Sequence, residues 1–220
     1  MISIIIPVYN CKRYVKEAVE SALNQTYLRK EVIVIDDGSH DGTAEILEGI
    51  KGIKIITKQN GGTGSALNAG ITEAKGEWIK WLSADDVMYT DALEQMMTHI
   101  SKIRDYKNCI FYTSYDIINA EGGFIKHYFE RPVENQTEEM MRKFFGNGST
   151  TMIHRSIFHK IGMFKEIPHS EDYEFWLRAL HNGIRLELIP SYTIQYRMHQ
   201  DQLTNTVGGS LDREIRAPYA

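Results

Sequence analysis

The stretch Ile2-Ser3-Ile4-Ile5-Ile6-Pro7-Val8-Tyr9-Asn10 decides the fold class of this chain of 220 residues. Its apolar, β-branched start is typical of a strand that is buried on both faces of a parallel sheet. Pro7 is expected to end that strand, because a proline cannot donate to the ladder of a sheet. Asn10 is then a candidate N-cap for a helix over residues 12–25, in which the apolar side chains form one stripe.

The rest of the first half repeats this alternation of apolar runs and amphipathic segments. Residues 31–35, 53–56 and 78–82 are expected to be strands, and helices are expected to begin near residues 41 and 63. Because the connections are short, the pattern predicts βαβ units with right-handed crossovers. The predicted fold class is therefore α/β, with a mostly parallel, Rossmann-like sheet flanked by helices.

The second half is less regular and predicts a smaller, mixed portion of sheet. Gly122-Gly123 indicates the turn of a hairpin between short strands over 115–118 and 124–128. The other expected elements are helices over 90–103, 138–145 and 171–181 and strands over 110–113, 184–189 and 193–197. Residues 204–220 show no apolar period and are expected to form a loose tail.

Charge, cysteine content and hydropathy narrow the class of protein. The chain has 25 Lys and Arg against 29 Asp and Glu, a formal net charge of −4, which argues against a basic nucleic-acid binder. Cys11 and Cys109 do not form a disulfide framework, so a reducing compartment is expected. No apolar run approaches the ~20 residues of a membrane span, and Met1-Ile2-Ser3 does not begin a secretory signal. We expect a cytoplasmic protein, with no more than peripheral association at the inner face of a membrane.

Two pairs of carboxylates follow strands of the expected parallel sheet. Asp36 and Asp37 come directly after the second strand, and Asp85 and Asp86 come after the fourth. Ligands bind in the crevice outside the carboxyl ends of such strands. Either pair alone would suit a turn or a helix cap. Two pairs on one edge repel each other unless a cation or a ligand offsets the charge, so the sequence predicts a binding site there.

Several sequence motifs occur in a fixed order from residue 1 to about residue 203. They are Ile4-Ile5-Ile6-Pro7-Val8-Tyr9-Asn10, Val34-Ile35-Asp36-Asp37-Gly38-Ser39 with Asp41-Gly42-Thr43, Asn60-Gly61-Gly62 through Asn68-Ala69-Gly70, Ala74-Lys75-Gly76-Glu77-Trp78-Ile79, Ser83-Ala84-Asp85-Asp86, and Glu171-Asp172-Tyr173-Glu174-Phe175-Trp176. Each motif is weak by itself. In this order they resemble the family 2 glycosyltransferases, which have the GT-A fold that binds nucleotide sugars.

The resemblance implies a nucleotide-sugar donor at the ends of the first, second and fourth strands. Asp37 would accept the N–H of the nucleotide base, since a carboxylate accepts without donating, and Asp36 would lie beside it. Asp85 would contact the ribose. The wall of the nucleotide site would be formed by Pro7, Val8, Tyr9 and Asn10.

Three further residues are implied near the diphosphate of the donor. Asn60, Gly61 and Asn68 would offer backbone and amide donors to it. The same residues would equally suit a turn and a helix start without any ligand, and the sequence leaves both interpretations open.

The resemblance also implies a divalent cation, Mn²⁺ or Mg²⁺, that bridges to the diphosphate. Asp86 would be its carboxylate ligand, because hard cations prefer oxygen ligands. His199 resembles a histidine that completes the metal shell in some relatives, with an exposed loop histidine as the alternative. The family usually has Asp where this chain has Ser83, so a direct metal contact at that position would be weaker.

Asp172 matches the catalytic base of the family. It would remove the proton of an acceptor hydroxyl that displaces the nucleoside diphosphate in one step, with inversion at the anomeric carbon. A helix cap is the structural alternative for this residue. Gly148, Ser149 and Glu171 would lie on the acceptor side, although the glycine would equally suit a purely conformational role.

The function implied is transfer of a sugar from a nucleoside-diphosphate sugar, a UDP-sugar being expected, to a hydroxyl of a saccharide, a lipid-linked or another acceptor in glycan or cell-surface polysaccharide synthesis. Residues 1–104 would be the donor-binding half and residues 105–203 the acceptor-binding and catalytic half of one GT-A domain, followed by the tail over 204–220.

Three other functions share part of this pattern. A phosphorelay receiver module would need a further single Asp and a Lys at later strand ends, which Ser83-Ala84-Asp85-Asp86 does not match. A nucleotidyltransferase would need a Gly-rich basic loop in place of Pro7-Val8-Tyr9-Asn10. A catalytically inactive member of the same fold, which binds a nucleotide sugar or scaffolds a partner, stays the alternative, although Asp37, Asp86 and Asp172 are intact.

Overall fold

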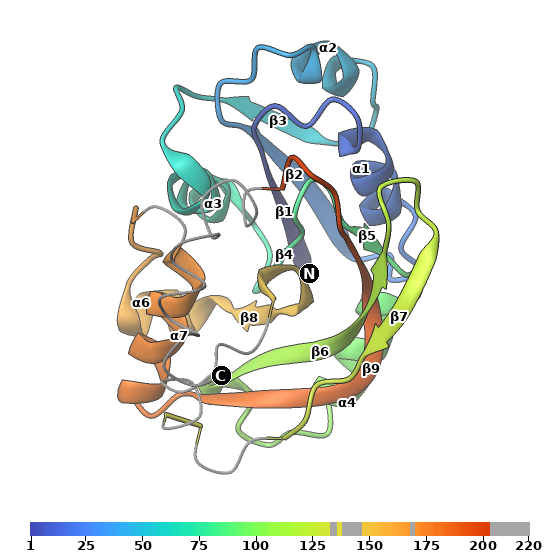
Figure 1. Cartoon of the computed structure of the whole chain (residues 1–220). Coiled ribbons are helices and arrows are strands. Elements are labelled where there is room, and N and C mark those ends of the chain that lie inside the picture. The colour runs from blue at the N-terminus through green and yellow to red at the C-terminus, as the bar shows by residue number, and fades with distance from the viewer. Residues whose placement is uncertain (133–135, 138–146, 168–169, 203–220) are drawn as a thin grey trace, which may run out of the picture.

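The computed structural model of the chain describes residues 1–132, 136–137, 147–167 and 170–202. The strands of these residues form one 9-stranded sheet in the order β3-β2-β1-β4-β8-β6-β9-β5, with β7 paired to β6. The sheet curls so that β6 and β9 lie across the molecule from β2 and β3 (Figure 1). No helix of the described residues is long and apolar enough to cross a bilayer.

The first half contains the βαβ units that the sequence predicts. Its elements are β1 (Ile2–Val8), α1 (Val15–Leu23), β2 (Lys30–Asp36), α2 (Thr43–Glu48), β3 (Lys54–Thr57), α3 (Gly62–Glu73) and β4 (Trp78–Trp81). β1 pairs in parallel with β2 and with β4, and β2 pairs in parallel with β3. The carboxyl ends of these strands therefore share one edge of the sheet.

The second half extends the same sheet with antiparallel and parallel pairs. Its elements are β5 (Val87–Met88), α4 (Ala92–Ile100), η1 (Tyr106–Asn108), β6 (Cys109–Ile118), β7 (Phe124–Tyr128), η2 (Gly148–Thr150), β8 (Met152–His154), α6 (Arg155–Ile161), α7 (Glu171–His181) and β9 (Arg185–Arg197). β8 lies antiparallel to β4 and β6, whereas β6 and β9 are parallel. The predicted α/β class with a smaller mixed portion is confirmed.

The predicted hairpin is present between β6 and β7, which are antiparallel. The amide of Asn119 donates to the carbonyl of Gly123 at 2.8 Å and closes the turn, in which Gly122 has a φ of 85° that favours glycine. The predicted helix over 138–145 and the tail over 204–220 lie outside the described residues.

Three details of the first and last strands differ from the prediction. β1 continues through Pro7 to Val8, because its pairing with β4 ends at Ile5 and no N–H is needed on that side beyond it. Asn10 is not an N-cap, since α1 begins at Val15, and Asn10 has a left-handed φ of 49°. The two strands expected over 184–189 and 193–197 are one strand, β9, whose register against β6 shifts near Ser114.

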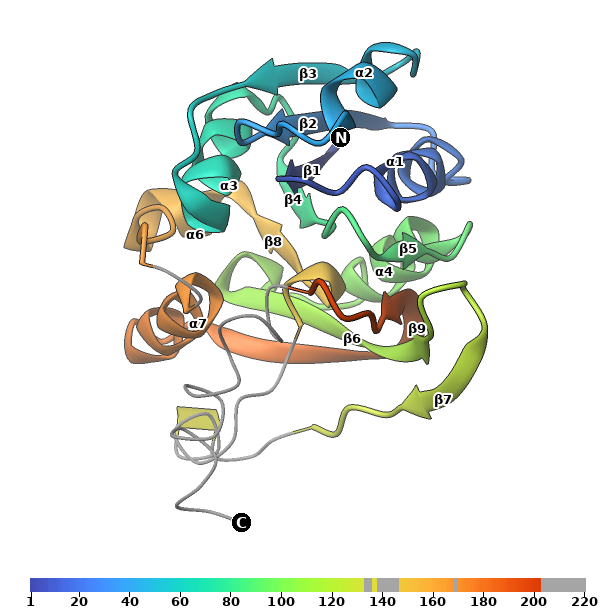
Figure 2. The same cartoon turned by 45° about the horizontal axis from the view of Figure 1, so that its top comes forward.

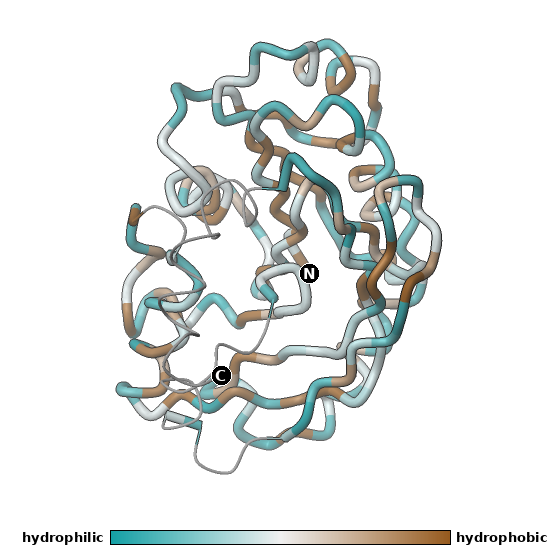
Figure 3. Tube along the Cα trace, in the orientation of Figure 1, coloured by the Kyte–Doolittle hydropathy of each residue, from teal (hydrophilic) through white to brown (hydrophobic). Residues whose placement is uncertain are grey.

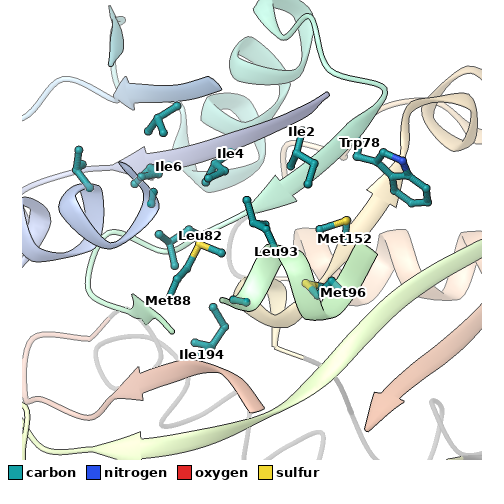
Figure 4. Packing of buried hydrophobic residues seen from close by; sticks show 14 of the residues in the cluster. Ile2, Ile4, Ile6, Trp78, Leu82, Met88, Leu93, Met96, Met152 and Ile194 are labelled. Carbon is teal, nitrogen blue, oxygen red and sulfur yellow. The ribbon is translucent and has the colours of Figure 1, made fainter. Parts of the chain in front are cut away.

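Two apolar clusters cover the two faces of the sheet. Ile2, Ile4 and Ile6 pack on the side of α1 and α4, while Ile5 packs on the side of α3, α6 and α7. Figure 2 shows these two groups of helices on opposite sides of the strands. Figure 3 shows the apolar residues concentrated along the strands, and Figure 4 shows the first cluster from close by. Trp176 is 1% exposed and belongs to the second cluster.

Candidate functional site at the carboxyl edge of the parallel strands

The loops after β1, β2 and β4 meet at one edge, as the parallel order requires. The amide of Asn10 donates to the hydroxyl of Ser39 at 3.0 Å, and the amide of His40 donates to Oδ1 of Asn10 at 2.9 Å. Cys11 Sγ donates to the carbonyl of Ala84 at 3.4 Å. Tyr9 projects from this edge with 47% of its surface exposed. An aromatic ring is therefore available to a ligand beside the carboxylate loops.

Asp37 is the best-connected carboxylate of the β2 loop. Its Oδ1 accepts from Lys58 Nζ at 2.7 Å, and its Oδ2 accepts from the amide of Gly62 at 2.8 Å, with Gly61 donating at 3.1 Å. The carboxylate thus lies at the N-terminus of α3, where the helix dipole favours negative charge. Gly61 directs its amide to Asp37, which favours the turn-and-helix interpretation of this residue. The role of Asp37 at the nucleotide base stays a prediction.

Asp36 is buried directly beside Asp37. Its Oδ1 accepts from the amide of Ser39 at 2.9 Å, and this bond holds the turn that carries Asp37. Sequence reasoning did not single out Lys58, although a lysine directly after the third strand, at the edge that carries the carboxylates, was a usable signal.

The side-chain amide of Asn68 contacts the backbone of Phe164, which favours the structural interpretation of this residue. Its Nδ2 donates to the carbonyl of Phe164 at 2.8 Å, and its Oδ1 accepts from the amide of Phe164 at 3.0 Å. Both ends of the side-chain amide are occupied by the backbone of the segment that precedes α7. Asn68 therefore fastens that segment to α3, while Asn60 is exposed at the surface.

The β4 loop brings Asp85 to a histidine from the far end of the chain. Nε2 of His199 lies 3.0 Å from Oδ2 of Asp85, with the side chain of Asp85 23% exposed and that of His199 8% exposed. A carboxylate oxygen and an imidazole nitrogen are both ligands that divalent transition ions accept. Asp85 and His199 are therefore two potential metal ligands that lie next to each other at this edge.

Asp86 points the other way, into the protein. It is fully buried, and its Oδ1 accepts from the amide of Arg197 at 3.0 Å. Burial raises the pKa of Asp86 well above its ordinary value of 3.8, and burial also lowers the pKa of Lys80 to about 7. The expected metal contact of Asp86 stays a prediction, but its position suits a support for the loop better than a ligand of an ion.

Ser149 and Gly148 lie beneath the same loop. The amide of Ser83 donates to Ser149 Oγ at 2.9 Å, and Lys80 Nζ donates to the carbonyl of Ser149. Ser149 is fully buried and its side chain holds the β4 loop, while its expected place on the acceptor side stays a prediction. A Cβ on Gly148 would lie 2.4 Å from the ring of Trp81, which explains why this position has none.

Gly148→Ala is expected to destabilise the fold by about 1–3 kcal/mol, because the added methyl group cannot enter the packed contact with Trp81. Gly49→Ala is the matched control. Gly49 has a φ of −77°, and a Cβ there would meet only ordinary contacts at 3.4 Å, so its stability should change by less than about 1 kcal/mol. Chemical denaturation of the two variants checks this, and equal midpoints would show that the Trp81 contact is loose.

Asp172 occupies the first turn of α7 and is partly buried. Its Oδ1 accepts from the amide of Tyr173 at 2.7 Å. Burial raises the pKa of Asp172 from 3.8 to about 7, and the neighbouring charge of Glu171 adds to the shift. A carboxylate with a pKa close to the working pH has the property that a general base needs.

Arg178 holds α7 to the segment before it, and Gly64 of α3 lies close to that segment and to Glu171 at the start of α7. Arg178 ties the helix to the preceding segment by donating to the carbonyls of Ile161 and Met163, the latter at 2.8 Å. On the α3 side, a Cβ on Gly64 would lie 2.8 Å from the carbonyl oxygen of Lys165, so the lack of a side chain there permits a close approach. Buried Glu171, expected on the acceptor side, packs at the same contact. α3 therefore joins the Asp37 end of the site to the Asp172 end.

A divalent ion is compatible with this edge. The described residues contain no group of three or more His, Cys, Asp or Glu that could hold a metal on their own. An ion that bridges to a diphosphate needs fewer protein ligands, because phosphate oxygens and water supply the others. Asp85 and His199 have the chemistry and the mutual distance for that role.

Comparisons with known proteins agree with this geometry. The chain is 37% identical over 222 residues to an uncharacterized glycosyltransferase of Rickettsia typhi, covering 96% of this chain and 68% of that protein. It is 32% identical to the chondroitin synthase of Pasteurella multocida over 83% of this chain and 19% of that enzyme. It is also 37% identical to an uncharacterized glycosyltransferase of Rickettsia felis. That match covers 92% of this chain and 35% of the relative's length.

The fold is that of GT-A glycosyltransferases. The crystal structure of S. aureus TarS 1-349 in complex with UDP-GlcNAc superposes with a TM-score of 0.70 at 20% identity, over 94% of this chain and 61% of that one. The UDP complex of the same fragment superposes with a TM-score of 0.68, over 90% of this chain and 61% of that one. The sequence model of glycosyl transferase family 2 matches residues 3–162. This chain therefore belongs to glycosyl transferase family 2.

Proposed function

We propose that the chain transfers a sugar from a nucleoside-diphosphate sugar to a hydroxyl group of an acceptor, with inversion at the anomeric carbon. A UDP-sugar is the proposed donor, and a saccharide or a lipid-linked saccharide is the proposed acceptor. Family membership supports glycosyl transfer. The complexes of TarS with UDP and with UDP-GlcNAc support the choice of nucleotide. The similarity to a chondroitin synthase and a hyaluronan synthase supports a saccharide acceptor.

The observation that carries the proposal is the position of Asp172 on α7, together with the raised pKa of its carboxyl. The single displacement requires one group that removes the proton of the attacking hydroxyl. Burial raises the pKa of Asp172 to about 7, and the residue lies in the first turn of α7, which packs on the donor-side helix α3. As the carboxylate, it would accept the proton on Oδ2, since Oδ1 already accepts from the amide of Tyr173.

The donor would lie along the edge between Tyr9 and Asp85. The exposed ring of Tyr9 would cover the nucleotide base, and Asp37 would accept the N–H of that base. We assign the divalent ion, Mn²⁺ or Mg²⁺, to Asp85 and His199 together with the diphosphate. When bound, such an ion offsets the negative charge that develops on the departing diphosphate. Asp86 would keep the loop in place from below.

A binding screen tests this function before the acceptor is known. Thermal unfolding should be followed with a panel of nucleoside-diphosphate sugars, each with Mn²⁺ and with EDTA. A ligand at about 100 Kd stabilises the folded state by ~2.7 kcal/mol, so the true donor should raise the midpoint clearly. We expect UDP-sugars to give the largest shift, and only with Mn²⁺. The absence of any shift with the whole panel, or equal shifts with EDTA, would contradict the proposal.

A further inference from the structure

Arg197 is a buried cation whose side chain connects several segments around the candidate site. The residue is 1% exposed at the end of β9. Its Nε donates to the backbone carbonyl of Asp85 at 2.9 Å, and its Nη2 donates to Oε2 of Glu17 at 2.6 Å. Its Nη1 lies within 3.4 Å of the carbonyls of Asn119 and Ala120. One guanidinium thus joins the β4 loop, helix α1 and the β6–β7 turn.

The backbone of Arg197 fixes the same region a second time. Its amide donates to Oδ1 of Asp86 at 3.0 Å, and its carbonyl accepts from Nε2 of Gln202. Oε1 of Gln202 in turn accepts from the amide of His199 at 3.3 Å. The two neighbours of the proposed ion, Asp85 and His199, are therefore both held by bonds that begin at Arg197.

Tyr14 completes the arrangement as an aromatic platform. The guanidinium carbon of Arg197 lies 4.9 Å from the centre of the Tyr14 ring, and the His199 ring lies 4.6 Å from it with an interplanar angle of 44°. The hydroxyl of Tyr14 is buried and has no hydrogen-bond partner among the described residues. The contacts of Tyr14 with Arg197 and His199 are therefore made by its ring and not by its hydroxyl.

We propose that Arg197 and Tyr14 are positioning residues that hold Asp85 and His199 at the separation a divalent ion requires. The inference rests on the proposed function, because it needs an ion at that pair. A buried cation is costly to desolvate, so packing alone does not call for an arginine here. Its planar fork of donors suits several fixed carbonyls at once, which lysine cannot match.

The test is the affinity for Mn²⁺ at saturating UDP, measured by electron paramagnetic resonance on the folded protein. Arg197→Lys keeps the charge but loses the fork, and we expect Mn²⁺ affinity to fall by about 10–100-fold, as for residues that orient metal ligands. Arg155→Lys is the matched control. Arg155 also donates to two backbone carbonyls, those of Gly76 and Ala74, but on another part of the sheet. Arg155→Lys should lower thermal stability and leave the affinity for Mn²⁺ within about twofold of the wild type.

A second pair of variants decides the matter if Arg197→Lys does not fold. Tyr14→Leu removes the platform and is expected to weaken Mn²⁺ binding by about tenfold, whereas Tyr14→Phe keeps the ring and should restore it. Unchanged Mn²⁺ affinity in Arg197→Lys, or equal losses in the two Tyr14 variants, would overturn the inference. If the wild-type chain itself bound no Mn²⁺ in the presence of UDP, the proposed function would fail instead.

Discussion

Asp172→Asn is expected to lower the rate of glycosyl transfer by ~10²–10⁴, the usual contribution of a positioned general base. The amide keeps the size of the side chain and its bond from the amide of Tyr173, but it cannot take the proton of an acceptor hydroxyl. The affinity for the donor should barely change, because the proposed donor contacts lie on other loops. Initial rates and donor Kd on the same preparation separate the two effects.

The pH profile gives an independent check on this residue. The base must be ionised to work, and burial raises the pKa of Asp172 to about 7, so kcat/KM should fall about tenfold per pH unit below pH 7 and level off above it. Stability should show the linked effect. Because the folded pKa lies above the ordinary 3.8, the protonated carboxyl favours the folded state, and this contribution is lost as the pH rises through about 7. Asp172→Asn should therefore be more stabilising at pH 8 than at pH 5.

Asp91→Asn is the matched control for Asp172→Asn. Asp91 also stands at the start of a helix, α4, but it lies outside the candidate site. The transfer rate and the pH profile of Asp91→Asn should equal those of the wild type. A rate for Asp172→Asn within a few-fold of wild type, or a product whose anomeric configuration is retained by NMR, would show that the proposed mechanism is wrong.

Much of the fold could be predicted because its strands are apolar on both faces. Apart from Ser3 and Glu31, the runs over 2–6 and 31–35 are apolar, and a sheet covered by helices on both sides buries such runs. β5 and β8 could not be predicted in the same way. Each has two or three residues, too few to show a period, and each exists because a longer neighbour, β9 or β4 and β6, offers it a partner.

The place of the candidate site was predictable, but the task of each residue in it was not. The carboxylates after β2 and β4 lie at one edge of the sheet because parallel strands end there. Which atoms they contact depends on segments remote in sequence. For Asn68 the sequence left a diphosphate contact and a structural role open, and its side chain bonds to the carbonyl and amide of Phe164. A lysine inside the apolar run of β4, Lys80, was the visible sign that a buried polar group lies beneath the loop.

The neighbours Asp85 and Asp86 show most clearly what sequence position leaves open. Asp85 lies in a turn that the amide of Asp86 closes by donating to the carbonyl of Ser83 at 3.2 Å, and only one carboxylate of the pair faces the ligand edge. The sequence motif does not say which. The structure turns Asp86 inward to the amide of Arg197 and leaves Asp85 partly exposed beside His199.

This difference predicts opposite outcomes for two conservative substitutions. Asp85→Asn should lower the affinity for Mn²⁺ in the presence of UDP by at least ~10²-fold, because a neutral amide replaces a charged ligand, and even residues behind a metal ligand cost 10–100-fold. Asp86→Asn should leave that affinity within about threefold. Its burial already raises the pKa of the carboxyl, and the oxygen of an asparagine can still accept from the amide of Arg197. Calorimetry of UDP with Mn²⁺ and with EDTA measures both variants.

Thermal unfolding of both variants serves as the control for this comparison, since a loss of affinity counts only where the fold is intact. If Asp86→Asn abolished Mn²⁺-dependent binding while Asp85→Asn kept it, the ion would belong to Asp86, and the loop would have to turn over when the donor binds. Equal losses in both variants would mean that the ion needs the whole loop rather than one carboxylate. Only a loss confined to Asp85→Asn agrees with an ion held at the partly exposed carboxylate, 3.0 Å from the imidazole that β9 brings to it.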